Sequence, residues 1–180
     1  KKKKLIIGYD PKLQTKKMVN FFFKDTNCKL LSIDKNLIDK LWLKKSNEKI
    51  KKFFTLPEKA VGQNYKLKVT KLINELNKKK IDVQFITASE NIAWLLNIRG
   101  RDSKFTPIPN GYLIVECNKK ISFFCNLKKI ESSFRKKFKN IIFIDIKNTG
   151  LFLSGLKSKK ISIDPLSCSM YFENIIRKNN

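Results

Sequence analysis

The sequence predicts an α/β protein in which helices flank a mixed β-sheet. From residue 65 to the end, apolar patterns follow in the order helix, strand, helix, hairpin, helix, strand, strand, helix, which is typical of an α/β domain. Apolar residues make up 42% and aromatic residues 11% of the chain, so a packed core is expected despite 31% charge. A length of 180 residues suits one domain, or one domain with part of another.

The first 33 residues predict a strand, a helix and a second strand. Residues 5–7 are apolar and end at Gly8, which indicates a buried strand, and Asp10-Pro11 follows as a turn. Thr15 can cap the following helix, whose apolar residues recur at helical spacing. These apolar residues are Met18, Phe21 and Phe22. Residues 29–33 give the next strand.

A domain boundary is expected in residues 44–59, which are rich in lysine and keep no sustained apolar period. An amphipathic helix begins at Tyr65. Its core face is formed by Tyr65, Val69, Leu72, Ile73 and Leu76, and its expected solvent face by Lys66, Lys68, Lys71 and Glu75.

Residues 83–86 predict a strand, and residues 87–90 resemble a capping box at the start of the next helix. That helix carries an apolar face and is expected to stop at Gly100. A loop rich in Pro, Asp and Lys then covers residues 101–110.

The last third of the chain continues the alternation. Residues 112–117 and 121–125 are apolar runs joined by three polar residues, which predicts a hairpin. The remaining expected elements are a helix over 127–138, a strand at 141–144, a short helical or looped segment at 148–156, a strand at 161–163 and a final amphipathic helix over 171–176.

Three aspartates stand where a predicted strand ends, namely Asp10, Asp145 and Asp164. Carboxylates at strand ends are common in α/β active sites, and three that converge could hold two metal ions, as in nucleases. Asp10 and Asp164 also precede a proline in two short, similar strand-Asp-Pro-helix segments. The favoured interpretation is therefore that they cap the helix or close the turn.

Charge and cysteine content limit the classes of function. The net charge of +25 would suit a polyanion, but only four of the 40 basic residues are Arg and the lysines are spread along the whole chain. We interpret the charge as compositional and expect no specific nucleic acid partner. With no His and no close Cys pair, a zinc site of the usual spacing is excluded. The four cysteines are expected to be reduced core residues.

No apolar run approaches the length of about 18 residues that spans a bilayer. The lysine-rich start is followed by too short an apolar run for a signal peptide. We therefore expect no membrane partner. The four cysteines, interpreted as reduced, favour a cytoplasmic location.

Residues 92–109 make a candidate functional rim, because a helix end, a glycine, charges of both signs and a proline-stiffened loop occur together. Trp94, Arg99 and Asp102 are its candidate residues. The alternative is that Trp94 packs in the core and Arg99 pairs with Asp102.

The sequence of residues 60–107 resembles the second domain of three-domain aminopeptidases P of the creatinase/prolidase superfamily. Residues 87–102 read TASENIAWLLNIRGRD, and further matches lie at residues 7–11, 37–42 and 111–115. The similarity keeps its order over nearly the whole chain. One departure is Phe105, where the family commonly has a His.

The resemblance implies a creatinase/prolidase N-terminal fold, with the C-terminal part of a first such domain at 1–55, a linker at 56–63 and a second domain at 64–180. Catalysis would belong to a C-terminal "pita-bread" domain that binds two Mn or Zn ions and removes the residue before a penultimate proline. This chain, without His, cannot supply that ligand set, so we expect no catalytic residue and no metal in it.

The resemblance gives the chain a supporting role, in which it shapes the cleft, restricts it to short peptides and builds the oligomer. Trp94, Arg99 and Asp102 would lie on the cleft rim. The expected partners are the catalytic domain of the same polypeptide, peptides with penultimate proline and further copies of the enzyme. The rival hypothesis is a basic nucleic-acid-binding or nuclease-like α/β domain that uses Asp10, Asp145 and Asp164.

Overall fold

The computed structural model describes residues 5–42 and 50–180, which form one five-stranded and two two-stranded sheets. The expected boundary segment is described only from residue 50 onward, so residues 44–49 of that prediction lie outside the described residues.

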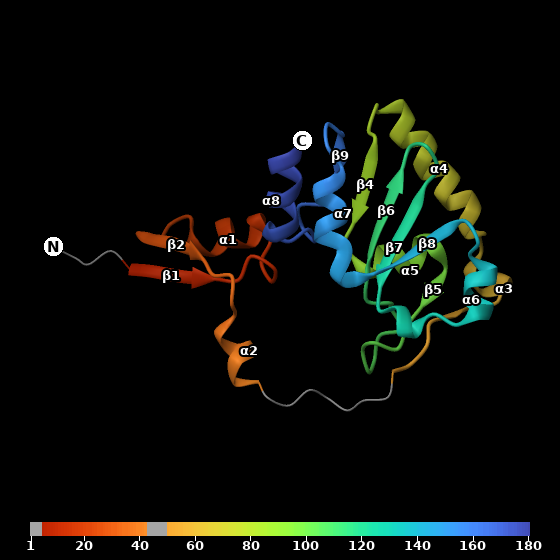
Figure 1. The fold of residues 1–180 in the computed structure, drawn as a ribbon, viewed down its shortest axis with the longest axis horizontal. Coiled ribbons are helices and arrows are strands. Elements are labelled where there is room, and N and C mark those ends of the chain that lie inside the picture. Colours follow the sequence, from red (N-terminus) through yellow and green to blue (C-terminus); the bar gives the residue numbers. More distant parts are fainter. Residues whose placement is uncertain (1–4, 43–49) are drawn as a thin grey trace.

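The N-terminal unit, residues 5–42, is a parallel strand pair with two helices (Figure 1). Its elements are β1 (Leu5–Tyr9), α1 (Lys16–Phe23), β2 (Cys28–Ser32) and α2 (Leu37–Leu41). In the register of the pair, Leu5 lies opposite Cys28. The predicted cap is confirmed, because the Thr15 hydroxyl accepts a hydrogen bond from the Met18 backbone N–H at 3.2 Å. The predicted order of strand, helix and strand is therefore confirmed.

The predicted burial of the first strand is wrong. Leu5 and Ile6 are largely exposed, as are Phe21 and Phe22 of α1, which buries Val19 instead. Two strands and two short helices offer too little surface to cover each other's apolar side chains. The N-terminal unit therefore presents apolar groups on its surface.

The central sheet has the strand order β8-β7-β6-β4-β9. Its neighbours pair in turn parallel, antiparallel, antiparallel and parallel, which confirms the predicted mixed sheet and the hairpin. The elements of this part are β3 (Phe54–Thr55), α3 (Glu58–Val61), α4 (Tyr65–Lys78), β4 (Val83–Ile86), α5 (Ser89–Leu96), β5 (Ile98–Arg99), β6 (Tyr112–Glu116), β7 (Ile121–Cys125), α6 (Ser132–Lys137), β8 (Ile141–Asp145), α7 (Thr149–Gly155), β9 (Ile161–Ser162) and α8 (Met170–Asn179), with 3₁₀ turns η1 (Leu127–Lys129) and η2 (Ile146–Asn148).

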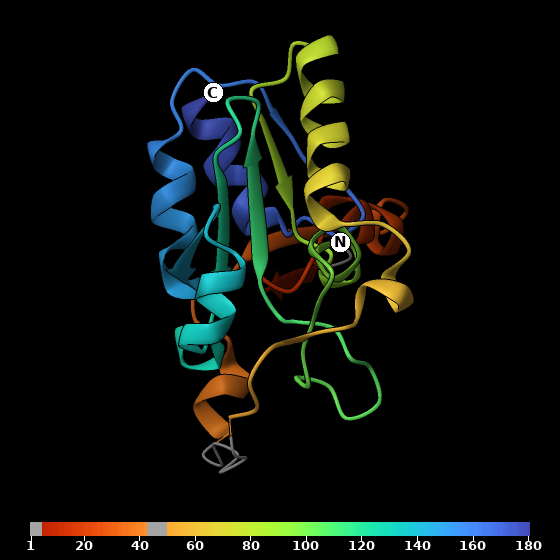
Figure 2. The ribbon, with the colours of Figure 1, turned by 90° about the vertical axis from the view of Figure 1, so that its right-hand side faces the viewer.

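Helices cover both faces of this sheet (Figures 1 and 2), so its strands are buried on two sides. Alternate strand residues separate into two cores. Leu113 and Phe123 pack with α4, α5 and α6 on one face, whereas Ile114 and Phe124 pack with α7 and α8 on the other. The predicted α/β class with helices flanking the sheet is confirmed.

The predicted helix over residues 127–138 is wrong in its extent, because the chain forms η1, an extended Ile130 and then α6. The Asn126 side chain accepts from the Lys128 backbone N–H at 3.0 Å and closes a turn. Ile130, at φ −99° and ψ 113°, interrupts the helical path. A local side-chain hydrogen bond thus outcompetes the apolar periodicity.

The N-terminal unit is joined to the central part through the start of α8. Ser169 gives this helix no side-chain cap. Instead, the backbone N–H groups of Met170 and Tyr171 donate to the carbonyl oxygens of Gln14 and Pro11, at 2.8 and 2.9 Å. Carbonyls of the N-terminal unit therefore take the place of the missing cap.

The expected boundary near residue 55 stays a prediction. Phe53 lies in the core beside Phe123, and Phe54 and Thr55 pair with Arg99 and Ile98. Among the residues described, no helix combines the length and the apolar character that crossing a bilayer requires.

Candidate functional site

The candidate rim is organised by α5, whose two ends differ from the prediction. The expected capping box is wrong, because Ala88 is the N-cap residue and the Thr87 hydroxyl lies 2.8 Å from that of Ser167. The expected stop at Gly100 is also wrong. Asn97 adopts a left-handed conformation with φ 56°, which ends the helix at Leu96. Residues 98–99 can then pair with β3.

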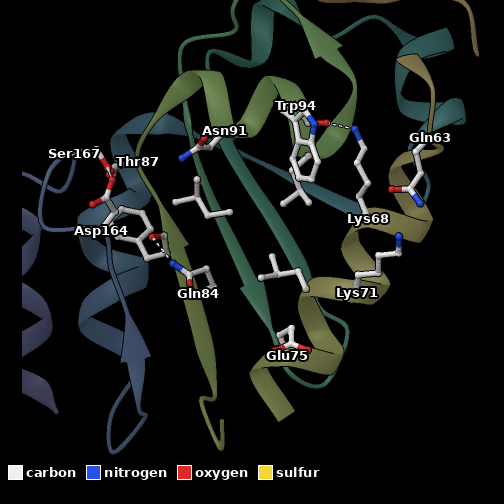
Figure 3. A pocket seen from close by; sticks show the side chains of 14 residues that line it. Gln63, Lys68, Lys71, Glu75, Gln84, Thr87, Asn91, Trp94, Asp164 and Ser167 are labelled. Atoms are coloured by element: carbon white, nitrogen blue, oxygen red, sulfur yellow. Dashed lines mark hydrogen bonds between the residues drawn. The ribbon is translucent and has the colours of Figure 1, made fainter. Parts of the chain in front are cut away.

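A pocket of about 560 Å³ opens beside α5 (Figure 3). We call it the α4–α5 pocket, since most of its lining comes from these two helices and from β4, with a contribution from the turn after β9. Its volume lies within the range of about 300–1,000 Å³ that is usual for ligand sites. The residues that line it are Gln63, Lys68, Lys71, Leu72, Glu75, Gln84, Phe85, Ile86, Thr87, Asn91, Trp94, Leu95, Asp164 and Ser167.

Trp94 lies on the wall of this pocket and is 62% exposed. Its neighbours Ile92, Leu95 and Leu96 are buried, so the indole stands on the exposed flank of α5, and the alternative that Trp94 packs in the core is wrong. An exposed tryptophan offers a large rigid surface to a ligand at little conformational cost. Its role on a substrate cleft stays a prediction.

Lys68 is the residue that the sequence pattern missed. It was expected on the solvent face of α4, yet only 4% of the residue is exposed. Its ammonium group donates to the Trp94 carbonyl oxygen and to the Asn97 side-chain oxygen. Burial, with a smaller effect from the nearby Arg99 charge, lowers the pKa of Lys68 below its ordinary value. Lys68 lies next to Val69, at the edge of the buried face of α4, and this position was the one feature of the sequence that could have indicated its burial.

Arg99 lies against the C-terminal end of α5, where the sequence placed it. Its guanidinium donates to the carbonyl oxygen of Ala93 at 2.7 Å and to that of Ile98 at 3.1 Å. A cation at this end also suits the negative pole of the helix. These contacts involve backbone oxygens, so the alternative partner, Asp102, does not hold the guanidinium.

Asp102 instead closes the loop that follows. Its side chain is 5% exposed, forms an ion pair with Lys129, and accepts from the Asn110 backbone N–H at 2.7 Å. Burial lowers the pKa of Lys129. Phe105, at the tip of the same loop, is 87% exposed. Asp102 thus determines the shape of the loop from within, while Phe105 faces solvent.

The three strand-end aspartates each serve a local turn. Asp10 accepts from the Lys12 backbone N–H at 2.8 Å, Asp145 from Lys147 at 2.9 Å and Asp164 from Leu166 at 2.9 Å. The turn-closing interpretation of Asp10 and Asp164 is confirmed. Within residues 5–42 and 50–180, no group of three or more His, Cys, Asp or Glu side chains is placed to hold a metal ion.

The cysteines are all free, and two of them occupy the core as expected. Burial raises the pKa of the Cys125 and Cys168 thiols to about 12. Cys117 is half-buried and packs against the core, whereas half-buried Cys28 belongs to neither core cluster, so the core prediction is wrong for Cys28.

Comparison with known proteins gives one family and a set of longer relatives. A family model described as the creatinase/prolidase N-terminal domain matches residues 44–180. A probable Xaa-Pro aminopeptidase P of Coccidioides posadasii is 34% identical over 117 residues, which are 61% of this chain and 19% of that protein. Xaa-Pro aminopeptidase 1 of Dictyostelium discoideum is 31% identical over 153 residues, 80% of this chain and 24% of that protein.

The crystal structure of an X-prolyl aminopeptidase from Caenorhabditis elegans, described as a cytosolic enzyme with a di-nuclear active site, has the same fold. It matches 98% of this chain and 31% of its own length, with a TM-score of 0.87 and 24% identity. The chain therefore spans between about a fifth and a third of the length of these relatives.

Proposed function

The chain belongs to the creatinase/prolidase N-terminal domain family, and we propose that it forms the non-catalytic N-terminal region of a longer Xaa-Pro aminopeptidase. The relatives that it matches carry this activity in their names and are several times longer. In this proposal, a catalytic part of the same polypeptide removes the residue that precedes a penultimate proline. Two metal ions, Mn or Zn, would act there, in keeping with the di-nuclear site described for the C. elegans enzyme.

Within that enzyme, we propose that the chain shapes access to the catalytic cleft, with Trp94, Arg99 and Asp102 on the rim. The observation that carries the proposal is the exposed indole of Trp94 on a helix whose other large apolar side chains face the core. Arg99 would act by holding the end of α5, and Asp102 by holding the loop 101–110. A rim of this kind would admit short peptides and exclude folded proteins.

We further propose a division into a first unit up to about residue 55, a linker and a second domain, and a cytoplasmic location like that described for the C. elegans enzyme. The exposed apolar side chains of the N-terminal unit, such as Phe21 and Phe22, support the proposal that further protein surface covers this unit. That surface would come from the rest of the polypeptide or from a second copy in an oligomer.

The rim role is tested with Trp94→Ala, introduced both in the 180-residue chain and in the longer polypeptide. In the chain, we expect the free energy of unfolding to fall by about 1 kcal/mol or less, because the indole is mostly exposed. In the longer enzyme, we expect kcat/KM for a Xaa-Pro peptide to fall about tenfold, which corresponds to about 1.4 kcal/mol of transition-state stabilisation. We expect Arg99→Ala to have a weaker effect on kcat/KM in the same direction.

The matched control is Leu95→Ala, one residue along the same helix and buried. It should cost about 2–5 kcal/mol of stability. The rim role would be contradicted if Trp94→Ala destabilised the chain as much as Leu95→Ala does, or left turnover unchanged. The 180-residue chain alone should not hydrolyse Xaa-Pro peptides with added manganese, and turnover by the chain would contradict its non-catalytic role.

A further inference from the structure

Lys68 is a buried cation that has no carboxylate partner among the described residues. It lies in the first turns of α4, on the side that faces α5, and none of the ion pairs within residues 5–42 and 50–180 involves it. Burying an ammonium group without a counter-charge is costly, and lysine is rarely found buried in this way. The polar contacts that it does make therefore indicate what the cation stabilises.

Those contacts converge on the C-terminal end of α5. Carbonyl groups in the last turn of a helix have no partner within the helix and carry its negative pole. Arg99 binds the Ala93 carbonyl oxygen, and Lys68 binds the next one, that of Trp94. Lys68 also donates to the Asn97 side-chain oxygen at 2.5 Å, while the Asn97 amide donates to the Gln63 carbonyl oxygen at 2.9 Å. The ammonium group thus ties α4 to the residue that ends α5.

The same ammonium group lies against the Trp94 ring. Its nitrogen is 4.5 Å from the centroid of the ring, within the range of a cation–π contact. Figure 3 shows the two side chains next to each other at one end of the α4–α5 pocket. Because Trp94 is 62% exposed, core packing constrains only part of its ring. Lys68 holds both the backbone and the ring of Trp94.

We propose that Lys68 is a positioning residue that fixes the Trp94 indole in the orientation in which it contacts the peptide substrate. This inference rests on the rim role proposed above for Trp94. Lys68 acts through Trp94 and is not itself a catalytic residue.

The first test measures the mobility of Trp94 directly. Trp42 and Trp94 are the two tryptophans of the chain, so Trp42→Phe leaves Trp94 as the sole indole. In this background, we compare Lys68→Met, which keeps the apolar stem, Lys68→Arg, which keeps charge and donors, and Lys66→Met, an exposed control on the same helix. The readouts are acrylamide quenching and the decay of fluorescence anisotropy.

We expect Lys68→Met to raise the quenching constant about twofold and to enlarge the fast component of the anisotropy decay, since the cation–π contact is lost. Lys68→Arg and Lys66→Met should keep the parent values. Lys68→Gln, with a neutral donor, serves as a second variant if Lys68→Met does not fold. If neither variant folds, or if both fold with the quenching and anisotropy of the parent, the positioning role is overturned.

The second test uses the longer enzyme. A loosened indole should weaken binding of substrate and transition state alike, so we expect Lys68→Met to raise KM about three- to tenfold with kcat nearly unchanged. Lys68→Arg should restore KM. Adding Lys68→Met to Trp94→Ala should have no further effect, because the two residues act through one contact.

The two tests separate failure of this inference from failure of the rim role. If Trp94→Ala leaves turnover unchanged, the rim role fails. The positioning role of Lys68 in peptide binding then fails too, even if the quenching data show that Lys68 orders the Trp94 ring. If Trp94→Ala impairs turnover but Lys68→Met changes neither quenching nor KM, the rim role stands and the positioning role is overturned.

Discussion

Asp102 shows how much one buried carboxylate can hold in place. It binds Lys129 in η1, the turn that follows the hairpin, and the backbone of Asn110 across its own loop. Both side chains of the ion pair are largely withdrawn from water, so the attraction is screened less than at the surface. Loss of one partner leaves the other as an uncompensated charge.

We therefore expect Asp102→Asn to lower the free energy of unfolding by about 2–4 kcal/mol, which urea denaturation of the chain would measure. Asp25→Asn is the matched control, because the Lys24–Asp25 pair is exposed and should contribute about 0–1 kcal/mol. Equal effects of the two substitutions would show that the Asp102 pair does not hold the loop.

Lys68 and Arg99 show a second feature at the residue scale, since both bind backbone oxygens at one helix end. The sequence placed Arg99 there because it follows the helix closely. The sequence pattern predicted that Lys68 is exposed to solvent, because a lysine on a helix is ordinarily exposed. The exception arises because the end of α5 lies next to α4 and supplies carbonyl partners.

At the scale of elements, two residues end α5 and allow the following loop to fold back, whereas the sequence predicted that Gly100 alone ends the helix. Asn97 ends the helix, and Gly100 permits the loop to return. A Cβ atom at Gly100 would lie 2.7 Å from the Ile108 carbonyl oxygen and 2.8 Å from the Pro109 Cα. These contacts are backbone atoms, so they cannot yield as a flexible side chain would.

Gly100→Ala should therefore destabilise the chain by about 1–3 kcal/mol, measured as a shift of the thermal or urea midpoint. Gly155→Ala offers the control, because a Cβ at this helical glycine meets no atom within 4 Å. It should cause no loss of stability, since alanine is the better helix former. A Gly100→Ala chain as stable as the parent would contradict the close approach of the loop.

On the scale of the whole molecule, the net charge of +25 is the feature most open to a functional interpretation. Its lysines lie along the entire chain, and the strand-end aspartates that a nuclease would need are engaged in separate turns. We expect affinity for a labelled DNA duplex of about 10⁻⁴ M or weaker at physiological salt.

A salt series of fluorescence anisotropy measurements checks this expectation. A protein that neutralises 6–10 phosphates loses about 10³–10⁵ in affinity between 50 and 200 mM salt. Micromolar binding at physiological salt with such a steep dependence would revive the nucleic-acid hypothesis. Weak binding with little dependence on the DNA sequence would support the interpretation that the net charge reflects amino-acid composition and not a nucleic-acid site.

The sequence by itself determined most of the longer elements and the family to which the chain belongs, but it missed the short elements α2, β3, α3 and β5. Apolar periodicity, a local property of the chain, predicts the central strands, α4 and the hairpin. The motif at residues 87–102, which is also local, indicates the family. Most boundaries of these elements could also be placed within a few residues. The exceptions, the end of α5 and the break before α6, were decided by single asparagines that act locally.

Only the tertiary structure decided what the candidate site contains. The burial of Lys68, its contact with Trp94 and the choice of Lys129 as the partner of Asp102 join residues from separate elements. Such contacts depend on how helices and strands are packed and on the direction in which each side chain leaves the backbone. Apolar periodicity indicates which face of a single helix or strand is buried. It cannot reveal which neighbouring element supplies the partner of a buried charged side chain.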